Sequence, residues 1–223
     1  MDFTRQPSYV PVPPTEQALP IQEPGTRPAR AVPYALHVRG EADFFAGSVK
    51  IHFANTGRAA AVFQVRSAGG LGGPWTYTVG PDARLSDTWA VRANGQTGYN
   101  LSVYGPNGFL RAFEGSISVL NKANVRIDSE YGEEENTIFL KIQNTGSQNA
   151  EVRIQNLYNG KSTFDLVMAG KTVSRAWQLE DSFGWYDLMV EVASEAGLSK
   201  QHLAGHVETG NDSMTDPAIG ASA

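Results

Sequence analysis

The chain has 223 residues, of which 41% are hydrophobic and 18% charged, with 23 Gly, 12 Pro and no Cys. The apolar content is too high for a disordered chain, and the Gly and Pro content is too high for a helical bundle. The lack of Cys excludes disulfides, a Cys-ligated zinc site and a thiol nucleophile. The net charge of −5 argues against general nucleic-acid binding, which needs a basic surface. No apolar run approaches the ~20 residues of a transmembrane segment.

The N-terminal part is rich in proline, since eight of the twelve prolines lie in residues 1–33. Proline fixes φ and removes a backbone donor, so this part favours an extended chain without a core of its own. We therefore predict a Pro-rich linker or strap over residues 1–33.

An internal repeat follows. Asn55-Thr56-Gly57 recurs 89 residues later as Asn144-Thr145-Gly146. At that offset, sets of apolar residues that alternate with polar ones also correspond: Val49, Ile51 and Phe53 with Ile138, Leu140 and Ile142; Ala61, Phe63 and Val65 with Ala150, Val152 and Ile154; Trp75, Tyr77 and Val79 with Phe164, Leu166 and Met168. After one single-residue deletion Trp89 corresponds to Trp177, and after a second Tyr99 corresponds to Tyr186. Alternation at period 2 is typical of strands with one buried face.

Each repeat contains about seven such strands, separated by Gly, Pro and Asn turn signals, which is typical of immunoglobulin-like sandwiches. We predict an all-β fold of two tandem immunoglobulin- or fibronectin-III-like β-sandwich domains, at residues 34–119 and 123–208. The small polar residues that follow predict a flexible tail over 209–223.

Acidic residues near the start of the second repeat are the metal candidates. A calcium ion takes about six to eight oxygen ligands, which this segment could supply. It lacks EF-hand spacing, however, and a run of Glu in a turn is usually solvated. Calcium is thus the weaker of two interpretations, and we expect no cofactor and no other metal. The calcium candidates are Asp128, Glu130, Glu133, Glu134 and Glu135.

Four apolar residues are candidates for contact with lipid. Adjacent aromatic residues on a strand cannot both face one core, which singles out Phe44 and Phe45. Leu71 lies between two Gly-Gly pairs, and Trp185 begins a predicted strand. The alternative for all four is ordinary packing at a sheet edge or in a hairpin loop.

The sequence shows no recognisable active site. His202 and His206 would lie about 13 Å apart on one face of a strand, too far for one zinc ion. No Ser lies in a nucleophile-elbow context, and no carboxylate pair has neighbours that would assign an acid and a base.

Several segments resemble the bacterial phosphocholine-preferring phospholipases C. They are Trp75-Thr-Tyr-Thr-Val79, the run from Tyr99 through Gly-Pro-Asn-Gly-Phe109 to Gly115, and Gly205-His-Val-Glu-Thr-Gly210. The resemblance implies a secreted enzyme whose N-terminal α/β domain cleaves phosphatidylcholine to diacylglycerol and phosphocholine. Two copies of a small C-terminal domain follow in that family.

This sequence lacks the hydrolase domain, so no catalytic residue is carried over. The resemblance implies that the chain is not itself an enzyme, and that its parent is a phosphoric diester hydrolase. The implied partners are the parent's catalytic domain and a phospholipid surface, and the implied location is secreted or periplasmic, with export encoded upstream.

Two other hypotheses remain. One is a carbohydrate- or cell-surface-binding sandwich, which the inward register of Trp75, Trp89 and Trp177 disfavours. The other is that the chain is a hydrolase in its own right, which the missing chemistry argues against.

Overall fold

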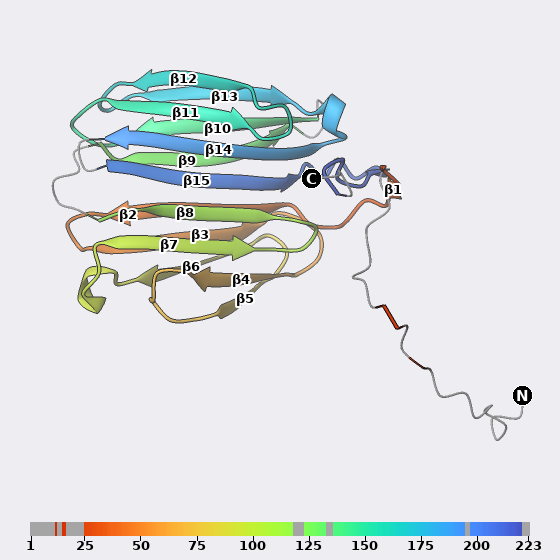
Figure 1. The fold of residues 1–223 in the computed structure, drawn as a ribbon, viewed down its shortest axis with the longest axis horizontal. Helices are drawn as coiled ribbons and strands as arrows, with labels where there is room; N and C mark the ends of the chain where they lie inside the picture. The colour runs from red at the N-terminus through yellow and green to blue at the C-terminus, as the bar shows by residue number, and fades with distance from the viewer. Residues whose placement is uncertain are drawn as a thin grey trace, which may run out of the picture.

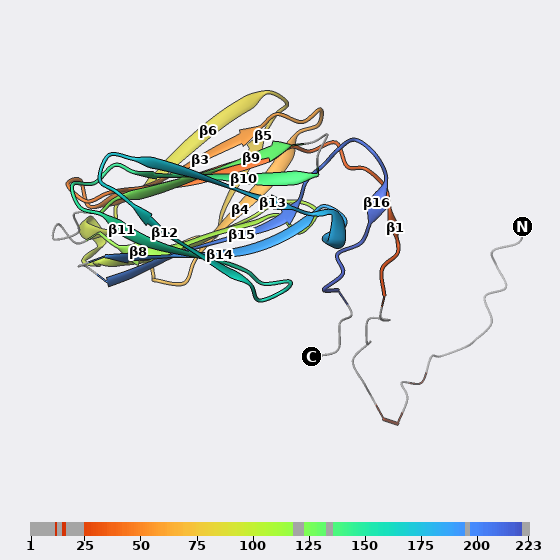
Figure 2. The same ribbon diagram turned by 90° about the horizontal axis from the view of Figure 1, so that it is seen from above.

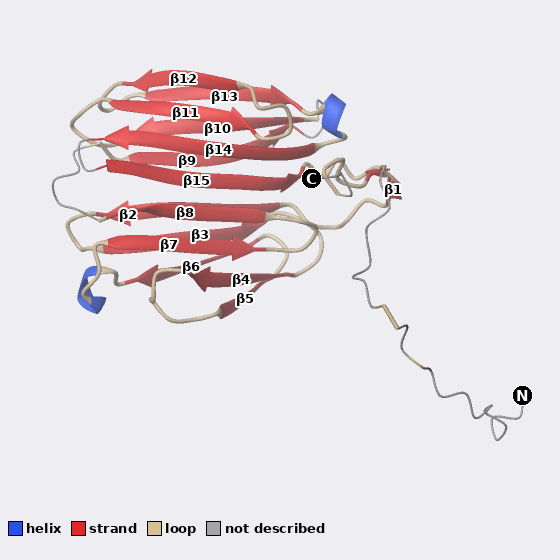
Figure 3. Ribbon diagram, viewed as in Figure 1, coloured by secondary structure: helices blue, strands red, loops and turns tan. Residues whose placement is uncertain are grey.

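The computed structural model describes residues 12, 15–16, 25–117, 123–132, 136–194 and 197–219. Among them the only helical segments are two short 3-10 turns, η1 (Arg92–Asn94) and η2 (Glu180–Ser182), and the remaining regular structure is β-strand (Figure 3). The prediction of an all-β sandwich fold is confirmed.

The first unit is a sandwich of seven strands. Its two sheets have the orders β2-β3-β6 and β8-β7-β4-β5. The first sheet consists of β2 (Leu36–Asp43), β3 (Ser48–Asn55) and β6 (Ala83–Trp89). The second consists of β4 (Ala61–Ser67), β5 (Trp75–Val79), β7 (Gly98–Tyr104) and β8 (Leu110–Ser116). Three strands facing four is an arrangement of the immunoglobulin-like and fibronectin-III-like kind.

The second unit repeats this topology, with sheet orders β9-β10-β13 and β15-β14-β11-β12. Its first sheet consists of β9 (Val125–Gly132), β10 (Thr137–Asn144) and β13 (Thr172–Gln178). Its second consists of β11 (Ala150–Asn156), β12 (Ser162–Val167), β14 (Trp185–Ser194) and β15 (Gly197–His206). Each unit has its own apolar core, built from alternating strand residues such as Ile51 and Phe63 in the first and Leu140 and Ile154 in the second.

The two units are joined by strand pairing. β8 pairs antiparallel with β15, so the two four-stranded sheets become one eight-stranded sheet that runs from β12 to β5 (Figures 1 and 2). In the opposite layer β2 lies against β9 but the two belong to separate sheets. There the contact is made by side chains, with ion pairs between Arg39 and Asp128 and between Glu41 and Arg126. The domains are therefore packed together along their edge strands.

The Asn-Thr-Gly repeat has a structural role in both units. Asn55 is fully buried, and its side-chain amide donates to the carbonyl oxygens of Ala59 (2.7 Å) and Val79 (3.1 Å). Asn144 does the same toward Gln148 (2.7 Å) and Val167 (3.0 Å). Each side-chain oxygen also accepts from the backbone N–H two residues on, at 3.0 Å. The motif thus closes a turn and ties it to the β5 or β12 strand.

The N- and C-terminal segments differ from the sequence prediction. β1 (Pro28–Ala29) pairs antiparallel with β16 (Ser213–Met214) beside one end of the sandwich (Figure 2). The predicted flexible tail therefore contains a strand, held because the N-terminal strap supplies its partner. Residues 1–11 and 220–223, at the ends of the two predicted segments, lie outside the described residues.

One part of the predicted repeat is wrong. Val79 pairs with Ala61 in the first unit, and Val167 pairs with Ala150 in the second, so the true correspondence at this strand is 88 residues. The predicted offset of 89 shifts β12 by one residue, and a one-residue slip moves every side chain to the other face of a sheet. Phe164 and Leu166 therefore correspond to Thr76 and Thr78, which do not face the core.

Candidate interaction surfaces

The turn between β2 and β3 exposes one of the predicted lipid-contact residues. Phe45 is 94% exposed, whereas Phe44 packs partly buried against the first core. The turn is rigidly held, since the Arg92 guanidinium donates to the carbonyl oxygens of Phe44 (2.7 Å) and Phe45 (2.8 Å). Asp43 Oδ1 accepts the backbone N–H of Phe45 at 3.0 Å. The structure thus presents one phenyl ring on a fixed turn.

The other two candidates are less accessible. Leu71 is partly buried against the first core. Trp185 is only 7% exposed, and its indole N–H donates to the carbonyl oxygen of Met214 at 2.9 Å. The expectation that Trp185 offers a lipid contact is corrected, because β16 in the C-terminal segment covers this residue. Sequence patterning did not indicate this strand.

The calcium candidates divide into two groups. Asp128 and Glu130 lie on strand β9, where the sequence suggested a loop, because Ile127 and Tyr131 pack into the second core and extend the strand. Asp128 is already paired with Arg39 at 3.4 Å. Glu133, Glu134 and Glu135 lie outside the described residues. Within the described ranges no three His, Asp or Glu side chains gather as a metal site would require.

One cluster has the composition of a hydrolase triad. His206 Nδ1 lies 3.0 Å from Glu208 Oε1, and His206 Nε2 lies 3.3 Å from Ser213 Oγ. The shorter contact of Nε2, however, is with the carbonyl oxygen of Phe183 at 2.9 Å, and the Ser213 hydroxyl donates to that same oxygen at 2.8 Å. The Ser213 hydroxyl proton is thus directed at the Phe183 carbonyl oxygen and not at His206 Nε2. The cluster holds the C-terminal segment in place and is not arranged for general-base catalysis.

The junction of the units buries an arginine. Arg111 on β8 is fully buried and donates to the carbonyl oxygens of Leu110 (2.7 Å) and Ala204 (3.0 Å). It also donates to Ser129 Oγ (3.3 Å) and to the hydroxyls of Tyr131 (3.0 Å) and Tyr186 (2.9 Å). Four of these five partners belong to the second unit, so this side chain fixes the two units to each other.

Burial opposes the charge of Arg111, but the Tyr186 and Tyr131 hydroxyls outweigh it, so the pKa of Arg111 is raised. Burial also raises the pKa of Tyr186 above its usual range. At neutral pH the guanidinium therefore stays charged and the Tyr186 hydroxyl stays neutral. No sequence pattern predicts this cluster, because its members come from four strands that only the pairing of the units brings together.

The outer face of the second unit carries an exposed apolar surface. Phe164 is 74% exposed and Leu166 60%, both on the edge strand β12, and Leu198 on β15 is 51% exposed. Leu166 pairs with Glu151, Glu151 with Ala193, and Ala193 with Leu198, so these residues form one row across four strands. A groove of about 440 Å³ runs along this row. We call Phe164, Leu166 and Leu198 the outer apolar patch.

An ion-pair chain borders the outer apolar patch. Glu191 accepts from Arg153 at 3.2 Å and lies 3.7 Å from Lys200 Nζ. The Arg153 guanidinium also lies 6.0 Å from the centre of the Phe164 ring. Charged and apolar side chains are therefore mixed on this face, since Glu151 lies between Leu166 and Ala193, and the ion-pair chain continues the row of Phe164.

Comparison with known proteins places this fold in a family. A family model described as "Bacterial phospholipase C, C-terminal domain" matches the chain twice, over residues 28–116 and 122–206. The chain belongs to this family. The two matches coincide with the two sandwich units, so each unit is one copy of the family's domain.

Named relatives agree. The non-hemolytic phospholipase C of Burkholderia pseudomallei is 43% identical over 98% of this chain and 31% of that protein. The non-hemolytic and hemolytic phospholipases C of Pseudomonas aeruginosa are 36% and 32% identical, over 94% and 93% of this chain, and 31% of each is covered. The chain therefore spans about a third of the length of these relatives. A solved structure of a bacterial ice-binding adhesin is similar only at a TM-score of 0.28, with 18% identity over 82% of this chain and 67% of that one.

A membrane-spanning helix is not found among the residues whose positions the structure gives.

Proposed function

We propose that this chain is the non-catalytic C-terminal region of a secreted or periplasmic phospholipase C, and that it packs against the catalytic part through the outer apolar patch. The parent would be the enzyme that hydrolyses phosphatidylcholine to diacylglycerol and phosphocholine. Support for the parent comes from the family, whose relatives are phospholipases C about three times as long as the match.

The observation that carries the docking proposal is the inverted pattern of β12. Thr163 and Asp165 take the positions of Trp75 and Tyr77 toward the sandwich interior, whereas Phe164 and Leu166 point outward. Two large apolar side chains left in water at an edge strand are unfavourable unless a partner covers them, because burying each is worth roughly 1.5–3 kcal/mol.

The test uses this chain and the separately produced catalytic part of the same protein. Size-exclusion chromatography should show the two comigrating, and the double variant Phe164→Ser, Leu166→Ser should abolish comigration. Val62→Ser is the matched control, since Val62 is an exposed apolar residue on the corresponding face of the first unit. Unchanged comigration of the double variant would contradict the docking surface.

The rigid, exposed Phe45 favours a second role in contact with a lipid surface. Phe44 and Leu71 follow the ends of β2 and β4, and both pack against the first core. The strands β2 and β4 run in the same direction (Figure 1). Binding to phosphatidylcholine vesicles should be apolar and insensitive to salt. Cosedimentation should weaken in Phe45→Ser and not in Val62→Ser, whereas equal cosedimentation of all three proteins would exclude this contact.

The carbohydrate-binding alternative has less support. It needs a flat platform of exposed aromatic rings, but Trp89 is buried and Trp75 and Trp177 pack partly buried against the two cores.

A further inference from the structure

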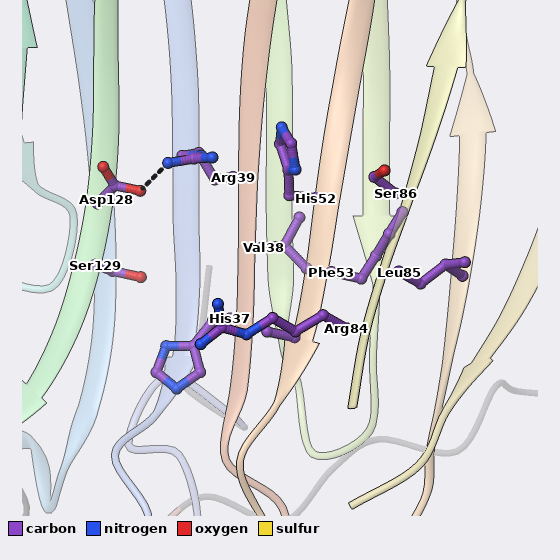
Figure 4. A pocket seen from close by; sticks show the side chains of 11 residues that line it. His37, Val38, Arg39, His52, Phe53, Arg84, Leu85, Ser86, Asp128 and Ser129 are labelled. Carbon is purple, nitrogen blue, oxygen red and sulfur yellow. Dashed lines mark hydrogen bonds and ion pairs between the residues drawn. The ribbon is translucent and has the colours of Figure 1, made fainter. Parts of the chain in front are cut away.

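A second groove lies on the outer face of the β2-β3-β6 sheet, where it meets the edge of β9 (Figure 4). Its volume is about 410 Å³, and its walls come from four strands of both units. It lies in the opposite layer from the sheet that carries the outer apolar patch. The side chains that matter for its chemistry are His37, Arg39, His52, Arg84, Ser86 and Asp128.

Strand register explains why this surface is hollow. His37, Ala54 and Arg84 face one another across β2, β3 and β6, and Arg39, His52 and Ser86 form the next row on the same face. Rows two residues apart along a strand are separated by about 7 Å. The single methyl group of Ala54 lies in the middle of the first row, so the longer side chains of its neighbours surround a depression in the surface.

The donors of this groove differ in how far they are already bonded: His37 Nε2 lies 3.2 Å from Thr56 Oγ1, and His52 Nε2 lies 3.3 Å from Glu41. Arg84 is exposed, and in the described part of the chain it makes no side-chain hydrogen bond or ion pair; Figure 4 shows its guanidinium reaching across β3 toward His37. Arg39 is held by Asp128 at 3.4 Å, yet its Nε is buried with no partner. Two guanidinium groups thus point into one groove that contains one carboxylate, in a protein whose net charge is −5.

His52 lies among charged groups. Burial and then the nearby Arg39 charge lower the pKa of His52, even though its Nε2 lies 3.3 Å from the Glu41 carboxylate, which acts the other way. The groups that face His52 are Arg39 and Glu41 from β2 and Lys50 from its own strand. Two of these three groups are cationic, which favours a bound anion.

We propose that this groove binds a phosphoryl group, either free as a small phosphate or phosphate ester or as the headgroup of a lipid. Guanidinium groups match the tetrahedral oxygens of phosphate with paired N–H donors, and the imidazole and serine hydroxyl supply further donors around them. Asp128 competes with the ligand for Arg39. The site is separate from the docking and lipid contacts proposed above and does not depend on them.

The imidazole signals of His37 and His52 provide the direct test. In NMR titrations of the 223-residue chain with inorganic phosphate at low ionic strength, both signals should shift and saturate. His202, which pairs with Asp187 in the opposite layer, serves as an internal reference. Added sodium chloride should weaken the binding, because the groove is open to solvent.

Two variants sharpen the test. Arg84→Ala should weaken phosphate binding about tenfold, the effect of losing one charge-assisted contact. Arg58→Ala is the control, because Arg58 is an exposed arginine of the same unit outside the groove. Asp128→Asn should tighten binding about threefold, since it frees Arg39 and removes one negative charge. Amide spectra verify that each variant is folded.

The source of the phosphoryl group is decided by comparing three probes: inorganic phosphate, glycerol phosphate, and vesicles of phosphatidylcholine containing phosphatidic acid. Saturation by the soluble probes without cosedimentation assigns a free phosphate ligand. Arg84-dependent cosedimentation with weak soluble binding assigns a lipid headgroup. Absence of saturable shifts at His37 and His52 with every probe, or equal affinity in Arg84→Ala and the unchanged chain, would overturn the proposal.

Discussion

The two units share one repeat, but their edge strands β5 and β12 contact the opposite sheet through different side chains. In the first, the Tyr77 hydroxyl of β5 donates to Asp87 of β6 at 2.5 Å, and the Trp75 and Trp89 rings meet edge to face at 5.4 Å. In the second, the Asp165 carboxylate of β12 pairs with Arg175 of β13. Asp165 takes the place of Tyr77, and Arg175 takes the place of Asp87.

This difference determines the outer faces. The first unit turns its aromatic residues inward and presents Thr76 and Thr78 outside. The second has the ion pair of Asp165 with the partly exposed Arg175 in their place and presents Phe164 and Leu166 outside. The two units therefore share one scaffold and differ in the side chains that β5 and β12 present on the outer face.

The largest expected effect on stability is at Arg111, in the junction between the two units. Arg111→Ala should lower the free energy of unfolding by about 3 kcal/mol, because it leaves a cavity and unpaired hydroxyls. Denaturant unfolding followed by tryptophan fluorescence should then show the two units unfolding separately. Gln201 takes the equivalent place on β15, since Gly115 and Gly205 lie alike beneath Tyr99 and Tyr186. Gln201→Ala should change stability by less than about 0.5 kcal/mol; a similar loss in both variants would contradict the role of Arg111.

The buried asparagines test what the units share. Asn55→Ala and Asn144→Ala should each cost about 2 kcal/mol, since each removes three hydrogen bonds from a buried turn. Asn149→Ala, which removes one exposed hydrogen bond to Ala169, is the control. Chemical denaturation of the three variants should give two large losses and one small one. A loss confined to one unit would show that the motif is not equivalent.

The side-chain pairs Asp165–Arg175 and Tyr77–Asp87 test where the units differ. Asp165→Asn and Tyr77→Phe should each cost about 1 kcal/mol. The first loss should shrink at high salt, because Arg175 is partly exposed and its attraction is screened, and the second should change less. Unfolding at low and high salt measures both. If salt changed the loss of unfolding free energy equally in both variants, the contrast between an ion pair and a neutral donor would be contradicted.

The outer apolar patch should matter least for stability. Phe164→Thr with Leu166→Thr gives the second unit the outer face of the first, and should change the free energy of unfolding by no more than about 0.5 kcal/mol. Thermal unfolding of this variant checks the prediction. A loss above about 2 kcal/mol would mean that these side chains already have a partner within the chain.

Alternation at period 2 was sufficient to predict both sandwiches, because each strand buries one face and therefore places an apolar residue at every second position. It failed at β12, since Phe164, Leu166 and Met168 alternate as a buried set would, and the one-residue deletion fits on either side of the strand. Only the pairing of Val167 with Ala150 decides the face.

The candidate sites were less predictable. Phe45 was found because two adjacent aromatic residues cannot share a core, but the burial of Trp185 depends on β16, a strand of two residues without patterning. Arg111 and the groove around Ala54 depend on register between distant strands, which local sequence does not specify.

The most direct test of the account compares the two edges of the eight-stranded sheet. Hydrogen exchange should be measured for β5 and β12 in this chain alone and in the intact phospholipase C proposed as its parent. If the second unit docks on the catalytic part, the amides of β12 (Ser162–Val167) exchange more slowly in the intact enzyme and those of β5 (Trp75–Val79) do not change. Protection of β5 alone, or no change at either strand, would contradict the claim that the second unit presents the binding face.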